Sequence, residues 1–364
     1  MIEVAMTEML TATARVRLPD AAGGVDAFVA RFADEALLER RANQVVIVHP
    51  RFGRICVSEE DGLLTIACAS PTPATLSFAK MASASAIDQL ARPDGVRFGW
   101  TGAGAGSWAL PFFREMRVAA VHDVTPRMRR LVLAGDAAHY AGGALHVRVL
   151  IPPAGRAPVW PHADEAGRMI WPKGPDALVP RVYTVRSVDI AQGEIAMDVA
   201  LHAGASTPGA DWARSSCVGS RVGLLGPGGA PVAAAAFNLF TGDETALPAI
   251  ARMLEALPGD AKAIVRIEVE DEAEEQKLAS PAALDVKWLH RRGAAAGTTG
   301  LIEAAVRAVP LPRNCADLRV FAGCEQATAR RLRAYLMQKR KVAKERLSIA
   351  AYWRLGHEGV DIGE

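Results

Sequence analysis

The rhythm of apolar residues changes at a Gly/Pro cluster, Gly226 to Gly229, and this change most constrains what the chain can fold into. Before the cluster, short β-like runs alternate with Gly, Pro and Asp turns, which is typical of antiparallel sheets. After it, strand-length apolar runs alternate with helical stretches, which is typical of a parallel sheet covered by helices. The two patterns predict at least two domains.

The antiparallel part is expected to close into a β-barrel. Its predicted strands cover residues 115–121, 129–133, 146–151, 181–186, 195–201 and 221–225. Along residues 195–201 large apolar side chains occupy every second position, as in a strand with one buried face. The Pro- and Gly-rich residues 152–180 form a long excursion from this barrel.

The parallel part begins near Phe237 and alternates strands with helices. Strands are predicted at 237–241, 263–269, 286–290, 318–322 and 347–353, and helices at 244–257, 300–309 and 326–341. Ligands of such sheets bind beyond the carboxyl ends of the strands. Thr241, Ala322 and Tyr352 therefore mark the candidate site.

Residues 11–100 predict a small α+β domain. Helices are expected at 26–41 and 73–91, and strands at 44–48, 53–58 and 63–69. The segment TGAGAGS at 101–107 has the composition of a linker. We therefore predict a multidomain chain: residues 1–106 are a small α+β domain of unknown role, 107–234 the antiparallel barrel and 235–364 the parallel-sheet α/β domain.

Charge and apolar patterning exclude several classes of protein. The net charge is only +2 and no basic stripe dominates, so we expect no nucleic-acid partner. Residues 1–10 lack the basic start of a secretory signal, and no apolar run approaches the ~20 residues that span a bilayer. The odd number of cysteines without a CxxC pair predicts reduced thiols. We expect a cytoplasmic protein with no membrane span.

The hexapeptide RVYTVR at 181–186 gathers groups that a flavin needs. In a strand, Arg181, Tyr183 and Val185 point one way, and Thr184 and Arg186 point the other. A flavin requires an aromatic stacking surface, a hydrogen-bond partner for its ring and cations or backbone donors for its phosphates. The alternative interpretation is an ordinary edge strand with surface arginines.

The hexapeptide resembles the Arg-x-Tyr-Thr-x-Arg signature of siderophore-interacting proteins, the FAD-dependent ferric-siderophore reductases. Similar segments occur in family order: PVWP (158–161), WPKGPDALVPR (171–181), TPGADWA (207–213), LLGPGG (224–229), GDETALPAI (242–250), AGCEQATARRLRAYL (322–336) and AYWRLG (351–356). The resemblance covers about residues 112–356. It implies an FAD-binding β-barrel followed by a ferredoxin-reductase-like, NAD(P)H-binding α/β domain.

The resemblance also implies a reaction in iron acquisition. Electrons would pass from NAD(P)H or a reduced ferredoxin through the flavin to Fe(III) held by a siderophore, and iron would leave as Fe(II). Hard oxygen donors hold the ferric ion more tightly than the ferrous ion, so adding one electron weakens the complex. Two alternatives remain: a non-catalytic module that binds siderophore or FAD, and a flavin reductase for another acceptor. The sequence does not specify the siderophore, the electron donor or the oligomeric state.

FAD contacts are carried over from the family residue by residue. They fall on Arg181, Tyr183, Thr184, Val185, Arg186, His202, Gly209, Ala210 and Trp212. The two arginines should contact the phosphates or the ring edge, Tyr183 should pack on the isoalloxazine, and Thr184 should bond near its reactive nitrogen. A helix start at 209–212 would offer N–H groups to the pyrophosphate. Trp212 is equally well interpreted as a buried anchor of that helix.

The nicotinamide nucleotide is assigned to Thr241, Gly242, Thr245, Gly323, Cys324 and Glu325. Cys324 either faces the nicotinamide or is a core cysteine. Asp243 and Glu244 repel phosphate, and we expect them to cap the following helix instead.

The remaining polar clusters have two readings each. Lys341, Lys344 and Arg354 either attract an anionic ferric siderophore or form a solvated helix end. The acidic run 268–277 is interpreted as a solvated turn or helix face in preference to a metal site. Because the histidines show no ligand spacing, we expect no metal site. Electron transfer through a flavin requires no catalytic side chain.

Overall fold

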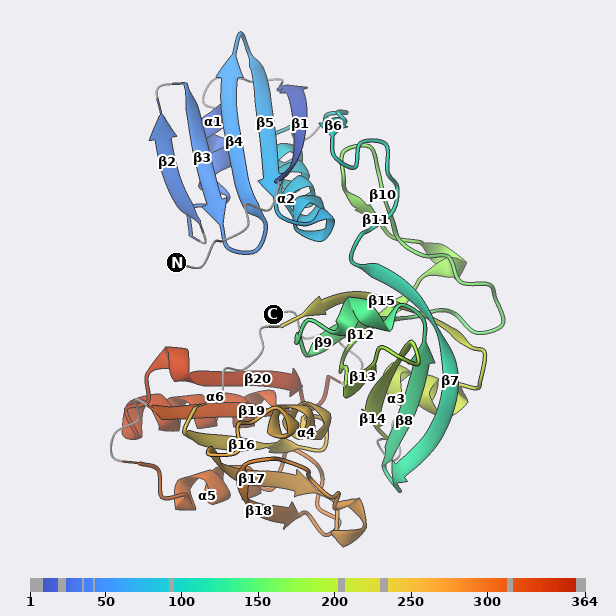
Figure 1. Ribbon diagram of the computed structural model, residues 1–364, viewed down its shortest axis with the longest axis vertical. Helices are drawn as coiled ribbons and strands as arrows, with labels where there is room; N and C mark the ends of the chain where they lie inside the picture. Colours follow the sequence, from blue (N-terminus) through green and yellow to red (C-terminus); the bar gives the residue numbers. More distant parts are fainter. Residues whose placement is uncertain are drawn as a thin grey trace. The chain divides into compact units, whose positions relative to one another are not determined.

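A computed structural model describes residues 9–357, except 19–23, 35, 42, 92–94, 202–206, 230–234 and 313–316. The chain divides into two compact units (Figure 1). Unit 1 comprises Met1–Phe113 and Val159–Ala177, and unit 2 comprises Arg114–Pro158 and Leu178–Glu364. Among the described residues, no helix is both long and apolar enough to cross a membrane.

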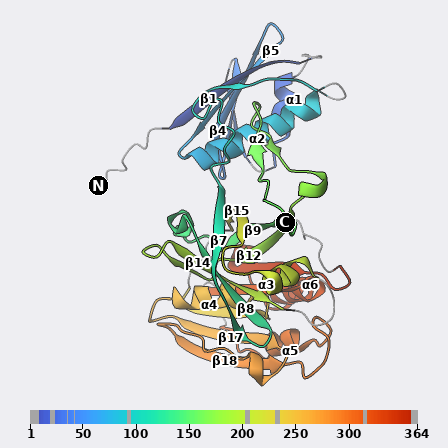
Figure 2. The same ribbon diagram turned by 90° about the vertical axis from the view of Figure 1, so that its right-hand side faces the viewer.

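Unit 1 is built on an antiparallel sheet with the strand order β2-β3-β4-β5-β1-β6. The strands are β1 (Leu10–Arg17), β2 (Leu37–Arg41), β3 (Gln44–His49), β4 (Gly53–Glu60), β5 (Leu63–Ser70) and β6 (Trp100–Gly102). Helices α1 (Gly24–Ala30) and α2 (Pro73–Leu90) pack on one face, and Figure 2 shows α2 running across it. Phe28, Ile47, Ile66 and Ile87 are fully buried between the two layers.

The predicted helix at 73–91 is confirmed as α2, but the predicted helix at 26–41 is wrong beyond Ala30. Helix α2 begins with a capping box, in which Thr72 and Thr75 bond each other's backbone N–H groups. Residues Leu37–Arg41 instead form the edge strand β2, paired with β3. All five are exposed, so burial imposes no period on their sequence, and pairing with β3 decides the structure.

Part of the barrel excursion folds with unit 1. Its central strands, β10 (His162–Ala163) and β11 (Met169–Ile170), form a small hairpin within residues 159–177. The first residues of the expected linker are also ordered into this unit, because β6 pairs with β1.

Unit 2 begins with the expected antiparallel barrel sheet, whose strand order is β12-β9-β15-β7-β8-β14-β13. The strands are β7 (Phe113–Thr125), β8 (Met128–Ala134), β9 (His146–Ile151), β12 (Val179–Thr184), β13 (Ser187–Asp189), β14 (Glu194–Ala200) and β15 (Arg221–Gly228). Helix α3 (Pro208–Ser215) contributes Trp212 to the barrel core, beside Leu131, Val149 and Met197. Among the described strands of this sheet, the sequence pattern missed the short β13.

The second part of unit 2 is the expected parallel sheet, with the strand order β18-β17-β16-β19-β20. The strands are β16 (Phe237–Asp243), β17 (Lys262–Val269), β18 (Ala283–His290), β19 (Leu318–Glu325) and β20 (Leu347–Trp353). The helices are α4 (Leu247–Glu255), α5 (Leu301–Ala308) and α6 (Gln326–Ala334), the last extended by a π-helical turn, Tyr335–Lys339. One apolar cluster packs under α4 and another under α5 and α6, so both faces of the sheet are covered.

A buried ion pair crosses two neighbouring barrel strands. Arg130 of β8 lies opposite Asp198 of β14 and donates two hydrogen bonds of 2.6 and 2.7 Å to its carboxylate. The Asp198 side chain is only 2% exposed. A buried carboxylate left without its partner costs far more than an exposed one.

Replacing Arg130 by Met should therefore destabilise unit 2 by about 3 kcal/mol, because Asp198 keeps its buried charge without a counter-ion. Urea denaturation followed by far-UV circular dichroism measures this loss. The matched control is Arg40→Met, which breaks an exposed pair with Asp26 and should cost under about 1 kcal/mol. Equal effects of the two substitutions would contradict the role given to Arg130.

Candidate functional site

Strand β12 carries Tyr183 of the hexapeptide, and its side chain packs against helix α3. The Tyr183 ring lies 6.3 Å from the Trp212 ring of α3, centroid to centroid. Its hydroxyl packs so closely on Gly209 that a Cβ at that position would overlap it. Burial raises the pKa of Tyr183 to about 12, so the phenol is neutral near pH 7. Residue 209 must therefore be glycine for this packing.

The start of α3 presents polar groups without partners in the described part of the chain. The Thr207 hydroxyl at the N-cap is buried and has no hydrogen-bond partner there. The first backbone bond of the helix is from Asp211 N to Thr207 O, which leaves the N–H groups of Gly209 and Ala210 ahead of it. Backbone N–H groups at a helix start form an anion site. His202 lies outside the described residues.

A series of polar contacts joins the barrel to the parallel sheet. The Thr184 hydroxyl lies 3.5 Å from His146 Nδ1, and His146 Nε2 lies 3.4 Å from the Tyr352 hydroxyl of β20. The His146 and Tyr352 rings meet edge to face, with their centroids 5.8 Å apart. Burial raises the pKa of Tyr352, so its hydroxyl keeps its proton. Sequence reasoning missed His146, although β9 and β12 pair it directly with Thr184.

The other residues of the hexapeptide make different contacts. Val185 is part of the barrel core, and Arg181 is half-buried and donates to Pro180 O. Arg186 forms a two-point ion pair with Glu255 at the end of α4, at 2.9 and 2.5 Å. Beside it, with Arg252, lies an open hollow of about 370 Å³. The positive charge of Arg186 is therefore already matched.

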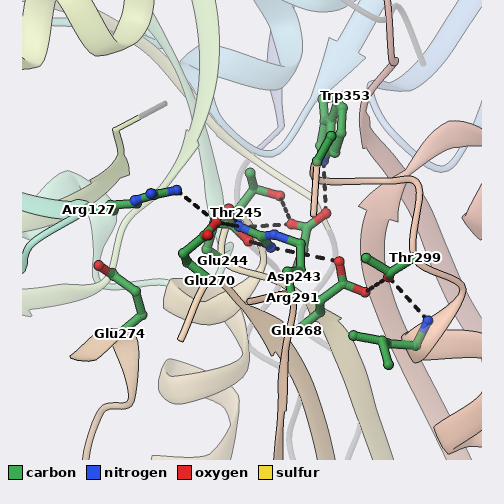
Figure 3. A network of polar contacts seen from close by, with 12 residues as sticks. Arg127, Asp243, Glu244, Thr245, Glu268, Glu270, Glu274, Arg291, Thr299 and Trp353 are labelled. Carbon is green, nitrogen blue, oxygen red and sulfur yellow. Dashed lines mark hydrogen bonds and ion pairs between the residues drawn. The ribbon is translucent and has the colours of Figure 1, made fainter. Parts of the chain in front are cut away.

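Asp243 at the carboxyl end of β16 accepts three hydrogen bonds (Figure 3). They come from Thr245 N at 2.9 Å, Thr245 Oγ1 at 2.5 Å and Trp353 Nε1 at 2.8 Å. The N-cap of α4 is Ala246, which has no side-chain bond, so the expected capping by Asp243 and Glu244 is wrong. The indole and the Thr245 side chain hold the Asp243 carboxylate instead.

Arg291 is a buried cation surrounded by carboxylates. It donates to both Glu244 oxygens at 2.7 Å and lies 3.5 Å from Glu270 and 3.7 Å from Glu268. Its side chain is 2% exposed. This cluster joins the ends of β16, β17 and β18, and the guanidinium balances the charge of the Glu244 carboxylate.

The acidic run 268–277 is only partly solvated, because Glu272 and Glu275 are exposed but Glu268 and Glu274 are buried. Glu274 accepts a 2.6 Å hydrogen bond from the Thr125 hydroxyl of the barrel. Glu270 accepts one of 2.8 Å from Arg127. These partners lie far away in the sequence, which is why the local pattern did not indicate burial.

The residues predicted for the nucleotide converge at two adjacent strand ends. Thr241 and Gly242 of β16 pair with Ala322 and Gly323 of β19, and the Thr241 hydroxyl is buried without a partner among the described residues. Glu325 caps α6 by accepting from Ala327 N and Thr328 N.

The thiol of Cys324 is fully buried. Burial, together with nearby carboxylates, raises its pKa, so the thiol is protonated. Of the two readings, the core cysteine is the one that fits this environment.

The three basic residues predicted for the substrate are exposed. Lys341 and Lys344 precede β20, and Arg354 follows its last residue, Trp353. No group of three or more His, Cys, Asp or Glu residues in the described ranges is arranged to hold a metal ion.

Comparison with known proteins identifies the regions that carry this site. The siderophore-interacting FAD-binding domain family matches residues 117–231, and the siderophore-interacting protein family matches residues 235–356. Ferric vibriobactin reductase ViuB of Vibrio cholerae is 30% identical over 213 residues, covering 58% of this chain and 77% of that protein. An NADPH-dependent ferric-chelate reductase of Escherichia coli is 27% identical over 249 residues, covering 66% and 92%.

Solved structures agree with these matches. A siderophore utilization protein from T. fusca has a TM-score of 0.59 and 34% identity, covering 68% of this chain and 95% of that one. The siderophore-interacting protein SipS from Aeromonas hydrophila has a TM-score of 0.58 and 26% identity, covering 67% and 92%.

The Asp243 environment predicts a dependence of stability on pH. Burial, with Glu244 beside it, raises the pKa of Asp243 from 3.8 to about 7. The folded state then binds a proton that the unfolded state has lost, so the free energy of unfolding should fall as pH rises from 3.8 to about 7. Asp243→Asn should flatten this fall, measured by urea denaturation across that range.

The matched control is Asp285→Asn, because Arg266 lowers the pKa of that carboxyl below 3.8 and it stays ionised over this pH range, so its removal should leave the slope nearly unchanged. An unchanged slope in the Asp243→Asn protein would contradict the account of this carboxylate.

Proposed function

Since this chain belongs to the siderophore-interacting protein family, we propose that it is an FAD-dependent reductase of ferric siderophores. Electrons pass from NAD(P)H through the flavin to Fe(III), and iron leaves the siderophore as Fe(II). The observation that carries the proposal is the packing of Tyr183 on Gly209, beside a helix start whose Thr207 hydroxyl has no partner among the described residues. These groups match the needs of a flavin ring and its pyrophosphate.

FAD, when bound, supplies the step from a two-electron donor to a one-electron acceptor. Tyr183 would provide the aromatic surface for the ring, and the N–H groups of Gly209 and Ala210 would receive the phosphates, with Arg181 as the neighbouring cation. Thr184 would supply a hydroxyl proton to the ring, and His146 would orient that hydroxyl. Arg186, two residues after β12, is paired with Glu255. We therefore assign it to holding the end of β12 to α4 and not to direct contact with FAD.

The nucleotide donor is proposed to bind at the carboxyl ends of β16 and β19, near Thr241, Gly242, Thr245, Gly323 and Glu325. Sheets of this kind bind dinucleotides there. The NADPH dependence of the Escherichia coli relative supports NADPH as the donor, with NADH or ferredoxin as the alternatives to be compared. Lys341, Lys344 and Arg354 are exposed, and they are proposed to attract an anionic ferric siderophore by long-range charge.

The domain limits and the location of the protein belong to the same proposal. The ranges 107–234 and 235–364 stay predictions, and the two family matches, 117–231 and 235–356, support them. Reduced nicotinamide nucleotides are cytoplasmic, so we place the protein in the cytoplasm.

Turnover of a ferric siderophore tests the function directly. Purified protein is mixed with FAD, a ferric catecholate siderophore and a ferrous trap, and NADPH or NADH starts the reaction. Catalytic formation of the ferrous complex supports the reductase. Bound FAD without ferrous product from any donor, reduced ferredoxin included, would instead indicate a binding module. Reduction of a quinone but not of the siderophore would indicate another acceptor.

Gly209→Ala should weaken FAD binding at least about tenfold, because the added Cβ displaces the Tyr183 hydroxyl. Quenching of flavin fluorescence measures the Kd. The control is Gly142→Ala, where an added Cβ meets nothing within 4 Å and the Kd should stay the same. Wild-type affinity in the Gly209→Ala protein would remove this packing from the flavin site.

A further inference from the structure

The excursion from the barrel is the loop that connects two paired strands, β9 and β12. Ile151 at the end of β9 pairs with Val179 at the start of β12, so residues 152–178 connect these two strands. Strand β12 continues to Tyr183 and Thr184. Residues 159–177 of this loop nevertheless pack with the N-terminal domain as part of unit 1. Unit 1 therefore contains most of a loop that connects two strands of unit 2.

Arg168 is the polar anchor of the loop. Its guanidinium donates two hydrogen bonds to Asp88 of α2, at 2.8 and 2.6 Å, and one of 3.1 Å to Asp164. It also reaches Val96 O at 3.3 Å and lies over the Phe98 ring at 5.3 Å. A guanidinium bound by two parallel hydrogen bonds is fixed in direction as well as distance.

The tip of the hairpin is buried beside this anchor. Trp100 Nε1 donates a 2.8 Å hydrogen bond to Ala166 O, and Ala166 is 1% exposed. Gly167 has a φ of +83°, and a Cβ there would lie 3.0 Å from Lys80 Cβ. Small residues at both positions let the hairpin seat on α2 and β6. Ala163 and Ala166 are the buried residues of the hairpin, whereas His162, Glu165 and Ile170 are exposed.

The loop leads directly into the proposed flavin strand. Residues 159–177 end one residue before Leu178, and Val179 begins β12. A free loop of this length samples many conformations, and holding its tip removes most of them. We propose that docking of this loop on the N-terminal domain stabilises the start of the flavin strand, and that Arg168 is the residue that holds the loop. In the test below, the Kd for FAD rests on the proposed FAD site, whereas hydrogen exchange does not.

The test compares wild-type and Arg168→Gln proteins as full chains. Hydrogen exchange without added FAD is followed in peptides covering residues 159–177 and 179–184, and the Kd for FAD is measured by fluorescence. Exchange should accelerate in both segments, and the Kd should rise about tenfold, because the loop that leads into β12 is no longer held by the Arg168–Asp88 pair. Asp88→Asn removes the same ion pair from the other partner and should produce the same pattern.

Arg40→Gln is the matched control, because it breaks an exposed arginine–aspartate pair in the same unit and should leave both readouts unchanged. If exchange rises in residues 159–177 while β12 and the FAD Kd stay at wild-type values, docking of the loop does not stabilise the strand. A wild-type protein that binds no FAD would overturn the proposed function, and exchange in β12 would still decide this inference.

Discussion

The arrangement of unit 2 depends on one buried cation. Arg291 is 2% exposed, and a guanidinium at such depth is stable only with carboxylates around it. Glu244, Glu268 and Glu270 supply them from the ends of two adjacent strands, and Glu270 extends the cluster to Arg127 of the barrel. The cluster therefore fixes the strand ends of the parallel sheet and ties them to the barrel. It also offsets part of the negative charge at the edge where the nucleotide is proposed to bind.

From this fixed edge, β20 brings Tyr352 to His146, which lies opposite Thr184 on the barrel. Trp353, the next residue, bonds Asp243 and holds the same strand to β16. The proposed flavin strand is thus bounded by α3 on one side and reached by the parallel sheet through His146 on the other. The loop that leads into this strand packs within unit 1.

Much of this architecture was predictable from the sequence, because periodicity reports which side chains are buried within one element. The barrel strands, the parallel sheet and the flavin motif all carry such local signals. The misses have a common physical cause. Burial of Glu268 and Glu274, the bond from Trp353 to Asp243 and the docking of Arg168 on Asp88 depend on partners distant in sequence. The family resemblance indicated the site but not these contacts.

The most direct test of the central claim is a half-reaction that needs no nucleotide donor. The FAD-loaded protein is photoreduced without oxygen and mixed with a ferric catecholate siderophore, and the flavin absorbance is followed beside a ferrous trap. The account predicts that the flavin reoxidises as ferrous complex forms, with two iron ions reduced per flavin because each takes one electron. Reduced flavin that persists in the presence of the ferric siderophore would contradict it.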